Sequence, residues 1–398
     1  MTKTNHKFKI SSLKSVFDSN ALWLSMLLGA FGYRLFLPLS PILPWLIFCM
    51  LFFTFCKVNP LDLRLRRWHW VVLGVQMLMS AVTYLGTMYF TRNPVLAQGL
   101  LLCFIMPTAT AAPIIAGKLG GSIQNLTTFT LLSNFATAII VPVTFPLINN
   151  NVQLSTFNFQ LSTFNSQLST FNSQLSTFNS QLSTSFIPAF TLIISRVAPL
   201  LIGPFFAAWL LRIGYNYYHR RKSLSASETR ALSVKRSFSV SGLSGEAGQK
   251  EFELSPGLAQ IPFYLWVASI IVLTAVVTNT TISNFQSQIS NIIILIIASF
   301  FACLIQFGVG KLIGFYLPAP SKGKDYQDIL INPAAAPKTM AGVSSITAGQ
   351  AFGQKNTSLG VWMAQQYLDP MAALGAAAYI IWQNIFNSLQ LTIAAHKK

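Results

Sequence analysis

The stretch TAGQAFGQKNTSLG, residues 347–360, places one lysine among glycines and small or neutral polar residues inside an apolar part of the chain. Glycine and asparagine weaken a helix interior, so this stretch predicts a helix that is interrupted near Lys355. A second stretch, MPTATAAPII at residues 106–115, carries Pro107 and Pro113 around small residues. Because proline has no backbone N–H and clashes with the preceding turn, a second interrupted helix is expected there.

The apolar character of the rest of the chain predicts an all-α polytopic membrane protein. Of the 398 residues, 53% are hydrophobic and only 9% are charged, far below the roughly 25% charged residues of soluble domains. A helix needs about 20 apolar residues to cross a bilayer. Ten such transmembrane helices are expected, at residues 20–38, 41–58, 69–91, 94–118, 122–147, 186–213, 258–279, 288–317, 341–366 and 370–394.

Lysine and arginine are placed as expected for ten spans with both termini in the cytoplasm. Short cytoplasmic connections collect basic residues, whereas the connections predicted on the opposite side at 148–185 and 280–287 carry none. The net charge of +18 is therefore a sign of topology, and no nucleic-acid partner is needed to explain it. The expected location is the cell (inner) membrane, where the lipid bilayer surrounds a multi-pass protein.

Two polar segments interrupt the spans. Residues 148–185 repeat the heptad QLSTFNS and are interpreted as a low-complexity outer loop, because Ser, Thr and Asn are poor helix formers; an adhesive or partner-binding stalk is the alternative. Residues 217–257 are rich in Ser, Gly, Lys and Arg, which predicts a disordered cytoplasmic loop. The outer loop divides the chain into a first unit, 1–147, and a second unit, 186–398, of five spans each.

The two interrupted spans, 94–118 and 341–366, hold equivalent positions in the two units. Each is the fourth of five spans, and because five is odd, equivalent helices run in opposite directions, as in an inverted repeat. Non-helical backbone within a membrane is tolerated only where protein or a water-filled cavity satisfies it. The two broken helices are therefore expected to cross at a polar site in mid-membrane.

Three stretches of the chain resemble the bile acid:sodium symporter family. They are PTATAAP at residues 107–113, GGSIQNLTTFTLLSN at 120–134, and GQKNTSLGVWMAQQYLDPMAALGAAAYIIWQN at 353–384, which ends in Trp382, Gln383 and Asn384 where the family has Trp-His-Asn. The resemblance implies a core domain of the spans 69–91, 94–118, 122–147, 288–317, 341–366 and 370–394. The other four spans would form a panel, and motion between panel and core would give alternating access.

The sequence departs from that family where the resemblance implies a sodium ion held by oxygen atoms around the crossing. A family glutamate falls at Ala351, a glutamine at Lys355, a Ser-Asn pair at Ala112 and Pro113, and a serine at Leu126. Family positions that offer oxygen are matched by Thr110, Thr130 and Gln76. All nine acidic residues lie in loops or at span ends, whereas a hard cation prefers anionic oxygen. Sodium coupling and a metal site are therefore not expected.

Inserting a lysine at the centre of a membrane helix costs roughly 2.5–3.5 kcal/mol of free energy. Lys355 therefore requires favourable partners at that depth. Our hypothesis is that its ammonium occupies the space of the missing sodium ion, at the carbonyl end of the half-helix that precedes it. The expected oxygen partners are Gln76, Thr110, Thr130 and the carbonyl groups near Gly353. Two alternatives remain: Lys355 loses its proton during a transport cycle, or its side chain snorkels to the outer surface.

These features favour a secondary transporter of a small organic solute, anionic and amphipathic, that uses no cofactor. The residues expected to contact the solute are Thr108, Thr110, Gln354, Asn356 and Thr357. Interhelical hydrogen bonding is an equally open role for these side chains. The alternatives are a sodium- or proton-coupled symporter of the same family and a membrane receptor that binds a solute without moving it. The span interiors offer no acid or histidine for an enzyme, and no cysteine at the first break for arsenite efflux.

Overall fold

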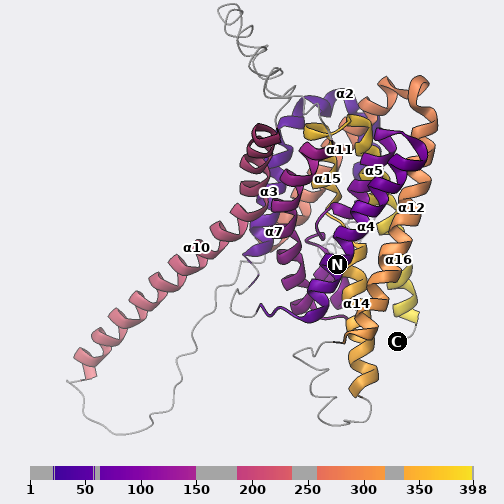
Figure 1. Cartoon of the computed structure of the whole chain (residues 1–398). Coiled ribbons are helices and arrows are strands. Elements are labelled where there is room, and N and C mark those ends of the chain that lie inside the picture. Colours follow the sequence, from indigo (N-terminus) through magenta and orange to yellow (C-terminus); the bar gives the residue numbers. More distant parts are fainter. Residues whose placement is uncertain are drawn as a thin grey trace, which may run out of the picture.

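The computed structural model describes residue 21 and residues 23–56, 58, 63–148, 186–234, 258–318 and 336–396. In these residues the chain is helical, with one isolated β-bridge and no strand (Figure 1). Among the described residues, six helical segments are long and apolar enough to cross a membrane: Tyr33–Phe55, Arg67–Thr91, Ile123–Ile148, Phe186–Tyr218, Ile261–Ser283 and Phe285–Tyr316. The molecule is therefore all-α with the apolar helices of a membrane protein, and the ten spans remain a prediction.

The helices follow the apolar runs of the sequence. After the helical residues 23–31, the elements are α2 (Tyr33–Phe36), η1 (Leu37–Ile42), α3 (Leu43–Phe55), α4 (Arg67–Thr91), α5 (Pro94–Ile105), α6 (Ala112–Lys118), α7 (Ile123–Ile148), α10 (Phe186–Val234), η3 (Leu258–Gln260), α11 (Ile261–Ser283), α12 (Phe285–Tyr316), α14 (Ala336–Gly353), α15 (Thr357–Tyr367), η4 (Pro370–Ala372) and α16 (Ala373–His396).

Glycine brings the helices of one group close together. On α12, a Cβ atom at Gly310 or Gly314 would clash with backbone atoms of α14. A Cβ atom at Gly375 of α16 would likewise clash with the backbone of Gly99 in α5. Small residues let helix backbones approach in membranes, so α5, α12, α14 and α16 are tightly packed. α4 packs on α5, and α15 packs on α16.

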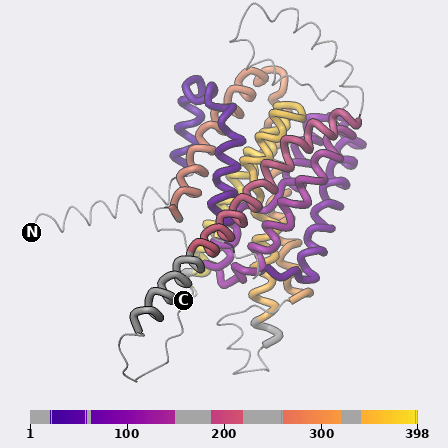
Figure 2. Tube along the Cα trace, turned by 90° about the vertical axis from the view of Figure 1, so that its left-hand side faces the viewer, coloured from indigo at the N-terminus to yellow at the C-terminus, as the bar shows by residue number. Residues whose placement is uncertain are grey.

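A second group contains α2, α3, α10 and α11. α11 lies beside α2 and α3 at one side of the bundle (Figure 2), and α3 also packs on α10. Contact between α10 and α7 joins this group to the rest of the molecule. Buried side chains from both groups, among them Ile47, Leu201, Leu273, Val141 and Leu359, belong to one continuous apolar cluster. Apolar packing therefore fills the boundary between the two groups.

The predicted start of the loop 217–257 is wrong, because α10 continues as a helix to Val234. Residues 220–233 contain Arg, Lys, Leu, Ala and Glu, which are good helix formers, and no Pro or Gly. A helix that is already formed extends without a new nucleation cost. Residues 235–257 and the predicted heptad loop beyond Ile148 lie outside the described residues.

Two short connections lie at the predicted places but are built differently from the prediction. The 280–287 connection is helical except at Asn284, whose Nδ2 donates a hydrogen bond to Thr280 O at 2.9 Å where α11 ends. One residue is enough for this turn. The connection expected at residues 39 and 40 lies inside η1, where Pro38 and Pro41 remove backbone donors and the chain adopts a tighter 3-10 turn.

Candidate functional site

The two predicted helix breaks are present. The span at 94–118 divides into α5 and α6, because Pro107 cannot continue α5. The span at 341–366 divides into α14 and α15. Asn356 begins α15, and its Oδ1 accepts a hydrogen bond from Leu359 N at 3.3 Å, as is typical of an N-cap. Residues with strong local preferences therefore decide where each span is interrupted.

The two non-helical segments cross and pair with each other. Thr108 and Lys355 form an isolated antiparallel β-bridge. Ala109 N donates to Gln354 O at 3.1 Å, and Asn356 N donates to Pro107 O at 2.8 Å. Backbone groups that the breaks remove from their helices thus find partners across the crossing, which meets the requirement that buried backbone groups be satisfied.

Three side chains from elsewhere in the chain donate hydrogen bonds to the carbonyl groups at the end of α5. The last four carbonyl groups of a helix have no partner within that helix. Here Cys103 O accepts from Gln306 Nε2 at 3.0 Å, and Phe104 O accepts from Lys355 Nζ at 3.1 Å. Gln76 Nε2 donates to Met106 O at 2.9 Å and to Ile105 O at 3.4 Å. Two amides and one ammonium therefore cap this helix end together.

Lys355 is buried, with 1% of its surface exposed. Besides its bond to Phe104 O, the ammonium lies 4.9 Å from the centre of the Phe352 ring, close enough for a cation–π interaction. The one acidic side chain that the structure describes is that of Asp369, which accepts a hydrogen bond from Met371 N in η4. The predicted alternative that Lys355 snorkels to the outer surface is wrong, because its ammonium reaches inward to α5.

No family model matches the chain, and no curated protein matches its sequence. Functional inference therefore depends on the geometry of the crossing. That geometry combines a helix carbonyl end, which carries partial negative charge, with a buried ammonium supplied by the other broken helix. An arrangement of this kind can hold two helix breaks together without a metal ion.

Two of the groups predicted to bind the ammonium, Thr130 and Gly353 O, form hydrogen bonds with other groups in the structure. Gln76 binds the same end of α5, but the acceptor of Lys355 Nζ is Phe104 O and not a carbonyl near Gly353. Gly353 O accepts instead from the hydroxyl of Tyr379 at 2.8 Å. Thr130 Oγ1 donates to Leu126 O in its own helix. The ammonium thus binds the carbonyl end of α5, whereas the predicted partner was the carbonyl end of α14.

The residues expected to contact a solute gather at the crossing. Thr108, Gln354, Asn356 and Thr357 are buried, and Thr110 is half-buried between α5 and α6. The hydroxyl of Thr108 donates to Ala351 O at 2.6 Å, so it ties the two breaks together. Asn356 Nδ2 is buried without a hydrogen-bond partner among the described residues. These groups line the crossing, and Asn356 has donor capacity to spare.

Three residues of the site were not predicted from the sequence, and Gln383 was identified only as a departure from the family motif. Gln306 caps α5, Tyr379 binds Gly353 O, and Ser133 Oγ accepts from Thr108 N at 3.0 Å. Gln383 binds both backbone groups of Lys355, accepting from its N at 2.9 Å and donating to its O at 3.4 Å. A signal was available for Gln306, because it is an isolated amide in a long apolar run and such polar residues are costly in a membrane.

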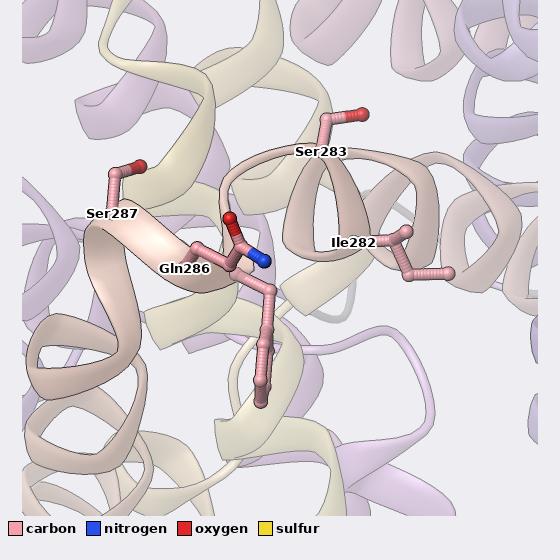
Figure 3. A pocket seen from close by; sticks show the side chains of 5 residues that line it. Ile282, Ser283, Gln286 and Ser287 are labelled. Carbon is pink, nitrogen blue, oxygen red and sulfur yellow. The ribbon is translucent and has the colours of Figure 1, made fainter.

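A surface pocket lies away from the crossing, at the turn between α11 and α12. It is lined by Ile282, Ser283, Phe285, Gln286 and Ser287 (Figure 3). Its lining residues come from a helix hairpin tip, and none of them belongs to either break. The pocket is therefore separate from the candidate site.

Proposed function

We propose that the chain is a secondary transporter of an amphipathic organic anion, related to the bile acid:sodium symporters. In this proposal ten spans form two inverted five-helix repeats, and the solute crosses by alternating access. The observation that carries the proposal is the buried Lys355 at the crossing of two broken helices. Discontinuous helices with polar midplane sites are typical of secondary transporters.

Lys355 takes the place of a coupling sodium ion in this proposal. The ammonium is a fixed cation that binds a helix carbonyl end, and carbonyl ends of half-helices coordinate Na⁺ in several transporter folds. The chain lacks a carboxylate at Ala351, where the resembled family has one. A tethered charge of this kind keeps the crossing closed through the cycle, so the transport mode is uniport or exchange. Sodium- or proton-coupled symport is the alternative within the same family.

The positive charge also sets the class of solute. With no acidic side chain paired to it among the described residues, Lys355 makes the crossing electropositive, which favours a solute with a carboxylate or sulfonate group. The apolar side chains that surround the crossing suit the apolar part of an amphipathic solute. A receptor that binds the same solute without moving it would share these features.

Uptake into proteoliposomes tests the proposal. The purified protein is reconstituted and supplied with labelled carboxylates, including cholate, under a sodium gradient, a proton gradient or neither. We expect counterflow uptake that needs neither gradient and that is lost in Lys355→Met. Lys118→Met, at the end of α6, is the matched control and keeps the uptake. Accumulation driven by sodium would contradict the surrogate role of Lys355, a proton-driven response would favour the coupled alternative, and binding without uptake would favour a receptor.

A further inference from the structure

Amide side chains form a line between α14 and α16 that begins at the candidate site, with Gln354 and Gln383, and continues beyond it. On α16, Gln383, Asn387 and Gln390 follow at intervals of four and three residues, which places them on one helix face. On the other side, Gln350 of α14 and Gln354 at the break are 1% and 2% exposed. We refer to these five side chains as the amide seam.

Hydrogen bonds join three members of the amide seam, Gln350, Gln354 and Gln390, across the two helices. Gln354 Nε2 donates to Gln350 Oε1 at 2.5 Å, and Gln350 Nε2 donates to Gln390 Oε1 at 3.2 Å. Nearer the crossing, Gln383 binds the backbone N and O of Lys355. The seam therefore runs from the helix crossing toward the end of α16 at His396.

Two buried polar atoms along this line have no hydrogen-bond partner among the described residues. Asn387 lies between the two linked positions of α16, is 5% exposed, and has an unpaired Oδ1. Asn356, at the crossing end, is 4% exposed and has an unpaired Nδ2. Buried polar atoms are nearly always satisfied, and ordered water is the usual partner where protein supplies none.

The packing around the seam favours water over an ion as its occupant. α14 packs closely on α12 at glycines, whereas it meets α16 through long glutamine side chains. Amide groups both donate and accept hydrogen bonds but carry no charge. They therefore suit a neutral ligand that needs two to four polar partners, which is what a buried water requires.

We propose that the amide seam holds a file of water molecules that connects the helix crossing to the aqueous phase at the end of α16. The file hydrates the crossing from within the tightly packed helix group, away from the apolar boundary with α3, α10 and α11. It exists whether or not the chain transports a solute, so its test is independent of uptake. The competing state is a dry seam, closed by amide–amide hydrogen bonds alone.

Thiol accessibility of the full-length protein in membrane vesicles distinguishes the two states. Asn387→Cys places a thiol on the seam, and Ile385→Cys places one at the same depth on another face of α16. The probe is methanethiosulfonate ethylammonium, applied to open vesicles, and modification is measured by mass above the background of the wild-type cysteines. Thiols react as thiolates, so a thiol in a dry apolar site is slow.

We expect Asn387→Cys to be modified at least tenfold faster than Ile385→Cys, and to be slowed when Gln350→Leu is added. Equal rates at positions 387 and 385 would overturn the proposal. Gln390→Cys is the second reporter if Asn387→Cys does not fold, with Leu389→Cys, at a position that is 54% exposed, as its neighbour control. A reaction at position 390 no faster than at 389 would overturn the proposal in the same way.

Discussion

Replacement of Lys355 by methionine separates the charge of this side chain from its bulk. Methionine keeps an unbranched chain of similar length, so it fills the space beside Phe352 and removes only the ammonium. The bond from Nζ to Phe104 O is lost, at about 1.5–3 kcal/mol for a charge-assisted hydrogen bond. The contact with the Phe352 ring contributes about 2 kcal/mol or more when it is desolvated.

The methionine variant also gains stability, because it no longer buries an ion. Lys355 is 1% exposed, and the penalty for burying an ion in a real protein is several kcal/mol. Losses and gain are of the same size, so we expect the free energy of unfolding of Lys355→Met to lie within about 2 kcal/mol of the wild type. Lys355→Ala also leaves a cavity, which costs a further 2–5 kcal/mol, roughly as for other large-to-small core changes.

Two measurements on the same preparation test this reasoning. Chemical unfolding in detergent is followed for the wild type, Lys355→Met and Lys355→Ala, and uptake is measured in proteoliposomes. We expect the methionine variant to be nearly as stable as the wild type but inactive. If it retained full uptake, the charge would have no functional role. A fall in stability as large as that of the alanine variant would show that the ammonium is a structural anchor.

Two further changes test the packing of the crossing and of its supporting helices. Gln306→Leu leaves Cys103 O without its donor, so unfolding measurements should show a loss of about 1–3 kcal/mol, and an unchanged stability would contradict the capping role. Gly314→Ala drives a Cβ atom into the backbone of α14, whereas Gly308 has open space in the same helix. We expect Gly314→Ala to lower the unfolding temperature and Gly308→Ala to raise or preserve it, since alanine favours a helix by about 1 kcal/mol; the reverse order would refute this packing.

The places where the helices break could be read from the sequence because they depend on local chemistry. Pro107 cannot continue a helix, and Asn356 caps one more readily than it continues one. The acceptor of Lys355 could not be read in this way. The ammonium does bind a helix carbonyl end, but the carbonyl belongs to Phe104 on the other broken helix. Which helix ends meet depends on tertiary packing.

Two other differences have similar physical origins. Residues 217–234 form a helix where a loop is predicted, because their polar and basic composition is typical of a loop although the individual residues favour a helix. Tyr379 was missed because its aromatic ring fits an apolar helix, and its hydroxyl matters only once Gly353 O is placed beside it. Gln306 depends on a partner far along the chain. The sequence shows that burying its amide costs free energy, but it does not show which group the amide binds.

The most direct test of the sodium-surrogate role is the unfolding temperature of the wild-type protein in equal concentrations of NaCl and KCl. A sodium site with a Kd one hundredth of the added concentration would stabilise the protein by about 2.7 kcal/mol. If the Lys355 ammonium already occupies the cation position at the carbonyl end of α5, the two salts give the same unfolding temperature. A stabilisation specific to sodium in the wild type would contradict this account.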